Sequence, residues 1–123
     1  MLNNILAVIP ARGNSKGVPL KNLKLMNGIP LISHSIRQAK MSKLVNRIIV
    51  STENENIAKI AESESTEVIL RPHNLAQDTS PIESTLKYML DYLYQKENYE
   101  PEIIVLLQCT SPIRDPLDID NAI

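Results

Sequence analysis

The stretch that decides the fold runs from residue 2 to residue 22 and reads LNNILAVIPARGNSKGVPLKN. Its first part, residues 2–9, is short, mostly apolar and bounded by Pro10, which is the pattern of a buried β-strand. Residues 10–22 are rich in Gly, Pro, Ser and Asn and therefore predict a loop. The sequence thus predicts a buried strand whose carboxyl end leads directly into a long polar loop.

Outward from this stretch, strand-like and helix-like patterns alternate along the chain. Short apolar runs predict further strands at residues 47–51, 67–70 and 102–107. Helices are predicted to begin at Pro30, to span residues 54–64, to begin again at Pro81 after a Ser80 cap, and to begin once more at Asp115-Pro116. This alternation predicts one α/β domain over residues 1–123, with a parallel sheet and helices on both faces.

The loops that follow the strand ends are the candidate ligand-binding segments. In open parallel sheets, ligands bind beyond the carboxyl ends of the strands. That rule selects the segments 10–22, 51–54, 71–80 and 108–115. Asn27-Gly28, outside these segments, is a turn signal ahead of the first helix.

Composition and charge exclude several classes of protein. The chain has 123 residues, a net charge of −1 and a single cysteine, Cys109, so no disulfide can form within it. No apolar run reaches the length of a membrane span, and the first residues lack the basic start of a signal peptide, so we expect a soluble cytoplasmic protein. Few aromatic residues and a near-zero charge argue against a nucleic-acid binder.

The charge is nevertheless unevenly distributed along the chain. Residues 1–52 contain eight Lys or Arg and no Asp or Glu, while the remaining residues hold all 14 acids. Solvated helix faces could produce this asymmetry by chance. Alternatively, the amino-terminal part presents positive charge to an anionic ligand.

The loop at residues 10–22 has the chemistry of a triphosphate site. Arg12, Lys16 and Lys21 place three cations within ten residues. Arginine holds phosphate oxygens in a forked geometry, and lysine acts as a point charge. Gly13 and Gly17 permit a close approach of the backbone, whose N–H groups can surround an anion. The loop matches neither the Walker A motif nor G-x-G-x-x-G, so it is a phosphate loop of another kind.

The motifs as a set resemble those of one enzyme family. The run IPARGNSKGVPLKN at residues 9–22 is similar to the signature of the acylneuraminate (CMP-sialic acid) cytidylyltransferases. The resemblance continues through RIIVST at 47–52, LRP at 70–72, LAQDTS at 75–80 and LLQCTSPIR at 106–114. It implies a Rossmann-like fold of the nucleotide-diphospho-sugar transferase type. It also implies a reaction in which CTP and a nonulosonic, sialic-acid-like sugar acid give the CMP-sugar and pyrophosphate, with Mg²⁺.

The resemblance also assigns roles to individual residues. Lys21 and Arg12 are expected to be catalytic, with Lys21 stabilising charge at the α-phosphate. The predicted nucleotide-binding residues are Arg12, Gly13, Asn14, Ser15, Lys16, Lys21, Asn22, Arg71, Asp78, Ser80, Gln108, Thr110 and Ser111. Of these, Arg71 is expected to contact the cytidine part. Gln108 carries an amide that can donate to and accept from a cytosine edge.

The metal and dimer functions are expected to lie outside this chain. Enzymes of the family are longer, so the chain resembles the amino-terminal, nucleotide-binding part of a truncated cytidylyltransferase. Asp118 and Asp120 would diverge by about 200° on a helix and form a poor metal pair. The resemblance therefore implies that the main Mg²⁺ ligands, most sugar-acid contacts and the homodimer interface belong to the missing part. The chain alone is expected to bind CTP weakly.

Other functions remain as alternatives. A 3-deoxy-octulosonate cytidylyltransferase is a neighbouring family, although its loop usually lacks the pattern N-S-K-G-V-P-L-K-N found here. A non-catalytic nucleotide-binding or assembly module would also explain the chain. Which sugar acid is used (sialic, legionaminic or pseudaminic) does not follow from the residues.

Overall fold

A four-stranded parallel sheet forms the centre of the protein. The computed structural model describes residues 4–11, 14–15, 18–19, 25–26, 28–70 and 82–107. The sheet consists of β1 (Ile5–Pro10), β6 (Arg47–Thr52), β7 (Glu67–Leu70) and β8 (Ile103–Leu106). Their spatial order is β7-β6-β1-β8, and each neighbouring pair is parallel. The predicted parallel sheet is therefore confirmed.

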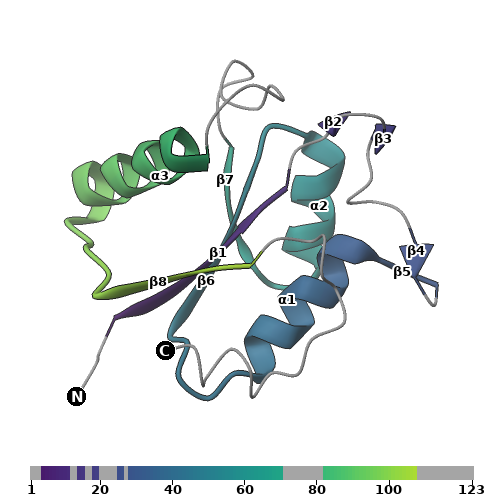
Figure 1. Ribbon diagram of the computed structural model, residues 1–123, viewed down its shortest axis with the longest axis horizontal. Helices are drawn as coiled ribbons and strands as arrows, with labels where there is room; N and C mark the ends of the chain where they lie inside the picture. The colour runs from purple at the N-terminus through teal and green to yellow at the C-terminus, as the bar shows by residue number, and fades with distance from the viewer. Residues whose placement is uncertain are drawn as a thin grey trace.

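Helices cover both faces of this sheet, as the alternation predicted. They are α1 (Leu31–Met41), α2 (Glu55–Ser63) and α3 (Ile82–Glu97). Figure 1 shows α3 on one side of the sheet and α1 and α2 on the other. The strand boundaries differ from the prediction by a few residues at most, and β7 spans the predicted residues.

Alternation along the strands divides the core into two layers. Ile9 and Val50 point toward α1 and α2, where they join Ile36 in one cluster of buried side chains. Val8 and Ile49, one residue earlier on the same two strands, belong to a second cluster with the α3 residues Met89 and Leu93. Because β1 is buried on both faces, its sequence is continuously apolar rather than alternating.

Two short hairpins interrupt the segment between β1 and α1. Residues 14–15 (β2) pair with residues 18–19 (β3) in antiparallel register, so the segment predicted as a loop at 10–22 contains a minimal hairpin. The second hairpin pairs Leu25–Met26 (β4) with Ile29–Pro30 (β5), with Gly28 in the turn between them. Gly28 has a φ of 78°, which confirms the predicted turn, since glycine reaches positive φ without strain.

The helix starts follow the predicted signals closely. Pro30 precedes the first helical residue rather than occupying it, because its extended ψ of 145° belongs to β5. Asn54 is the N-cap of α2, and its Oδ1 accepts hydrogen bonds from the N–H groups of Asn56 and Ile57 at 2.9 and 3.0 Å. The predicted Ser80 cap, Pro81 and the start at Asp115-Pro116 lie outside the described residues.

A charged cluster joins the amino-terminal ends of the strands, which we call the amino edge of the sheet, to the end of α3. Arg47, the first residue of β6, donates two 2.8 Å hydrogen bonds to the carboxylate of Glu67 and one of 2.9 Å to Glu97. Its guanidinium also lies 4.6 Å from the ring centre of Tyr99. Arg47 lowers the pKa of the Glu97 carboxyl, chiefly through the hydrogen bond. Arg47 thus connects β6, β7, α3 and the segment before β8.

Replacing Arg47 should destabilise the fold at neutral pH. We expect Arg47→Met to lower the free energy of unfolding by about 1–2 kcal/mol, the range for charged hydrogen bonds with half-exposed partners. The pKa of Glu97 is lower in the folded state, so its contribution is present above the unfolded pKa and disappears as pH falls through the folded pKa. Urea denaturation at pH 7 and pH 3 should therefore show the gap between wild type and variant shrinking in acid. An equal gap at both pH values would contradict this assignment.

Membrane insertion finds no support in the described helices. None of α1, α2 and α3 combines the length and the apolar character that crossing a bilayer requires.

Candidate functional site

The four parallel strands place their carboxyl ends along one edge of the sheet, which we call the carboxyl edge. Two hydrogen bonds extend the strand pairing there. The Ala11 N–H donates to the Ser51 carbonyl, and the Leu107 N–H donates to the Val8 carbonyl, both at 2.9 Å. Strand β1 is flanked by β6 on one side and β8 on the other. The chain thus leaves β1 at the point where the strand order reverses, the position at which such sheets bind ligands.

Three of the predicted ligand-binding residues follow immediately on the described strand ends. Arg12 comes after the buried Ala11, Arg71 after Leu70 and Gln108 after Leu107. The strand pairing therefore brings these three points of the sequence to one edge of the sheet, as predicted. Their side chains lie outside the described residues.

The remaining predicted site residues are only partly within the described structure. Asn14 and Ser15 form the two-residue strand β2, of which the backbone is described. The other predictions fall outside the described residues and stay predictions: Gly13, Lys16, Lys21, Asn22, Asp78, Ser80, Thr110 and Ser111.

The turn between β6 and α2 is the part of the carboxyl edge that the structure defines in detail. Thr52 is fully buried, and its Oγ1 accepts a 3.1 Å hydrogen bond from the Asn54 N–H. Asn54 in turn caps α2. Ser51 is also buried, and its Oγ has no hydrogen-bond partner among the described residues. Sequence reasoning selected residues 51–54 as a candidate ligand-binding segment but assigned no role to Ser51 itself, because a serine in an apolar strand gives no signal of its own.

Part of the positive charge in the amino-terminal half has a structural use. Arg37 on α1 forms a 2.9 Å ion pair with Glu64, and the Lys40 ammonium donates to the Glu64 carbonyl. The hydrogen bond from Arg37 lowers the pKa of the Glu64 carboxyl. Glu64 caps the carboxyl end of α2, just before β7 begins, so these contacts lie at the amino edge. With Arg47, three of the eight cations in residues 1–52 therefore serve the fold there and not an anionic ligand at the carboxyl edge.

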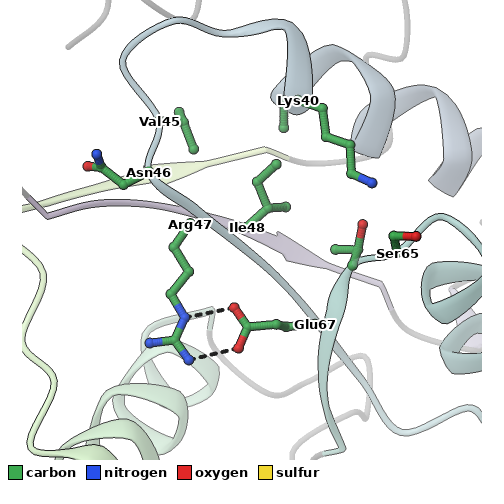
Figure 2. Close-up of a pocket in the computed structure, with 9 residues that line it drawn as sticks. Lys40, Val45, Asn46, Arg47, Ile48, Ser65 and Glu67 are labelled. Carbon is green, nitrogen blue, oxygen red and sulfur yellow. Dashed lines mark hydrogen bonds and ion pairs between the residues drawn. The ribbon is translucent and has the colours of Figure 1, made fainter.

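A cavity of about 290 Å³ lies beside this charged cluster. It is lined by the end of α1 and by the starts of β6 and β7. Figure 2 shows Arg47 and Glu67 facing each other through two hydrogen bonds, with Lys40 and Ser65 above them in this view. The charged groups of the wall already pair with protein atoms, and the cavity lies at the amino edge, away from the predicted ligand-binding segments.

Divalent metal binding depends on oxygen and nitrogen ligands converging on one point. Within residues 4–11, 30–70 and 84–107, His, Cys, Asp and Glu side chains form no group of three that could hold a metal ion.

The comparison with known proteins decides the family. A family model described as cytidylyltransferase matches residues 6–123. The chain belongs to the cytidylyltransferase family. The predicted resemblance is confirmed by relatives that carry acylneuraminate names, such as N-acylneuraminate cytidylyltransferase A of Danio rerio, 38% identical over 98% of this chain. The CMP-N,N'-diacetyllegionaminic acid synthase of Legionella pneumophila is 42% identical over 97% of the chain.

The fold of the chain also matches that of solved nucleotidyltransferase structures. A CMP:2-keto-3-deoxy-manno-octonic acid synthetase complexed with CTP matches 97% of this cytidylyltransferase chain, with a TM-score of 0.79 and 23% identity. At that identity the likeness shows the fold alone, and it confirms the predicted Rossmann-like architecture. The chain spans 51% of the Legionella relative, 27% of the Danio relative and 45% of the solved structure.

Proposed function

We propose that the chain forms the nucleotide-binding part of an enzyme that transfers CMP from CTP to a nonulosonic sugar acid and releases pyrophosphate. The observation that carries the proposal is the common edge of the sheet, from which the segments beginning at Arg12, Arg71 and Gln108 all emerge. Those segments contain the cations and amides that a cytidine triphosphate requires. Membership of the cytidylyltransferase family supports the choice of CTP.

The chemistry of the transfer explains the need for the basic loop. An oxygen of the sugar acid forms a new bond to the α-phosphorus of CTP and loses its proton. The bond from that phosphorus to the oxygen bridging to the β-phosphorus breaks, and pyrophosphate leaves with the electron pair. Negative charge develops on the phosphoryl oxygens during this exchange, so fixed cations such as Lys21 and Arg12 would stabilise the transition state. Magnesium would neutralise further charge when bound.

The names of the sequence relatives support a nine-carbon acceptor. Relatives with 35–42% identity are described as acylneuraminate cytidylyltransferases or as a diacetyllegionaminic acid synthase. A 3-deoxy-octulosonate acceptor is the second candidate, favoured only by a solved structure with 23% identity. We therefore place sialic, legionaminic and pseudaminic acids ahead of the eight-carbon acid.

Pyrophosphate release provides the direct test of this function. The longest form of the protein that its gene encodes should release pyrophosphate from CTP when a nonulosonic acid is present, and the eight-carbon acid should be a poorer acceptor. ATP in place of CTP serves as the matched control and should give no release. Equal rates with CTP and ATP would overturn the proposal. If the eight-carbon acid were the preferred acceptor, the proposed acceptor would be wrong, whereas the proposed transfer of CMP from CTP would stand.

A further inference from the structure

The buried hydroxyl of Ser51 suggests a role that the sequence motifs do not assign. Ser51 is 1% exposed, and its Oγ has no hydrogen-bond partner within the part of the chain that the structure describes. Native proteins contain few such groups, because a buried hydroxyl without a partner has lost its water and gained nothing. The position therefore requires an explanation.

The place of Ser51 in the sheet indicates one. It is the fifth of the six residues in β6, and it pairs with Pro10 of β1 and Ile69 of β7. The Ser51 carbonyl already accepts the N–H of Ala11, the residue directly before Arg12. Ser51 thus lies at the carboxyl edge, between the strands whose exits lead to Arg12 and to Arg71.

The direction of the side chain follows from strand alternation. Ile49, two residues earlier, packs against Met89 and Leu93 of α3. Ser51 therefore faces the α3 side of the sheet. Helix α3 runs from the carboxyl edge toward the amino edge, since Glu97 near its end bonds Arg47 at the start of β6. The Ser51 hydroxyl consequently lies on the face covered by the first turns of α3.

The side chains of Thr52 and Asn54, which follow Ser51 in the turn, have internal partners. Thr52 Oγ1 accepts the Asn54 N–H, and Asn54 Oδ1 accepts two N–H groups of α2. The turn is therefore already stabilised without Ser51. The Ser51 hydroxyl makes no hydrogen bond within the described residues, and it lies at the edge of the sheet where ligands bind. Its position therefore favours a hydrogen-bond partner that belongs to the ligand.

We propose that Ser51 is a positioning residue of the nucleotide site, whose hydroxyl obtains a hydrogen-bond partner only when a cytidine nucleotide is bound. The inference rests on the proposed function. The free protein carries the unfavourable buried hydroxyl, and the bound protein gains a hydrogen bond in its place. The Ser51 hydroxyl thereby lowers the stability of the free protein and raises its affinity for the nucleotide.

A second buried serine provides a matched control. Ser35 on α1 is 0% exposed, and its Oγ also has no partner among the described residues. It lies on the core-facing side of α1 with Ile32, Ile36 and Ala39, all fully or almost fully buried. Ser35→Ala removes the same group from the same degree of burial, but on the opposite face of the sheet from α3.

The test combines thermal melting with an NMR titration of the 123-residue chain by CTP at millimolar concentrations, which detects weak binding. Both Ser51→Ala and Ser35→Ala should melt at the wild-type temperature or above it, because each removes an unfavourable buried hydroxyl. Only Ser51→Ala should weaken CTP binding, by about fivefold, the value of one neutral hydrogen bond. In the longest form of the protein, Ser51→Ala should raise the KM for CTP and leave kcat within about twofold.

The outcomes separate this inference from the function on which it rests. Unchanged CTP affinity in Ser51→Ala, with wild type responding to CTP, would overturn the role of Ser51 and leave the function intact. Equal weakening in Ser35→Ala would also overturn it, since the effect would then be a general one of the core. No response of the wild-type chain to CTP would overturn the proposed function and this inference together.

Discussion

Lys21→Ala should lower the turnover of the cytidylyltransferase by about 100- to 1000-fold, the loss typical of removing one group that stabilises transition-state charge. The reason is the position of charge in the reaction. The bond changes occur at the α-phosphorus, and the lysine of the motif K-N at residues 21–22 is the cation that the family resemblance assigns to that phosphate. A cation that acts mainly in the transition state changes kcat more than KM.

The measurement is steady-state pyrophosphate release with CTP and the preferred sugar acid. Lys59→Ala is the control, because Lys59 is an exposed lysine in the middle of α2 and has no predicted contact with nucleotide. Lys21→Arg keeps the charge but not the compact geometry of an ammonium, so partial activity is expected. Turnover of Lys21→Ala equal to that of Lys59→Ala would remove the role assigned to Lys21.

The central strand β1 was predictable because it is buried on both faces. Ile5 to Ile9 read as an unbroken apolar run, and burial of both alternate faces requires that pattern. Apolar periodicity likewise located α2, whose inward residues Ile57 and Ala61 recur at helical spacing. These features depend on residues close together in the sequence, so a single sequence contains them.

The features that escaped prediction depend on residues far apart in the chain. Arg47 contacts Glu67 and Glu97, which are 20 and 50 residues away, and nothing near Arg47 in the sequence indicates either partner. The unpartnered hydroxyl of Ser51 follows from its burial beneath α3, which only the assembled sheet reveals. At the candidate site, the sequence supplied the residue types and the expectation of a common edge, and the structure supplied the strand order β7-β6-β1-β8 that forms this edge.

The second large effect is expected from the core, where Leu6→Ala should lower the free energy of unfolding by about 3 kcal/mol. Leu6 is fully buried in β1, in register with Arg47 of β6 and Ile104 of β8. It packs in the cluster that joins the sheet to Met89 and Leu93 of α3. The substitution removes buried methyl groups and leaves a cavity between two rigid layers, where the surroundings relax little.

This loss is a large fraction of the stability of a small domain, which totals about 5–15 kcal/mol. Urea denaturation followed by circular dichroism gives the difference, and an unchanged m-value would show that the unfolding transition itself is the same. Leu44→Ala is the matched control, because it makes the same chemical change at a side chain that is 46% exposed, where about 0.5 kcal/mol or less is expected. Similar losses in the two variants would mean that α3 does not cover β1. Since Ser51 faces the same layer, that result would also remove the burial on which its proposed role depends.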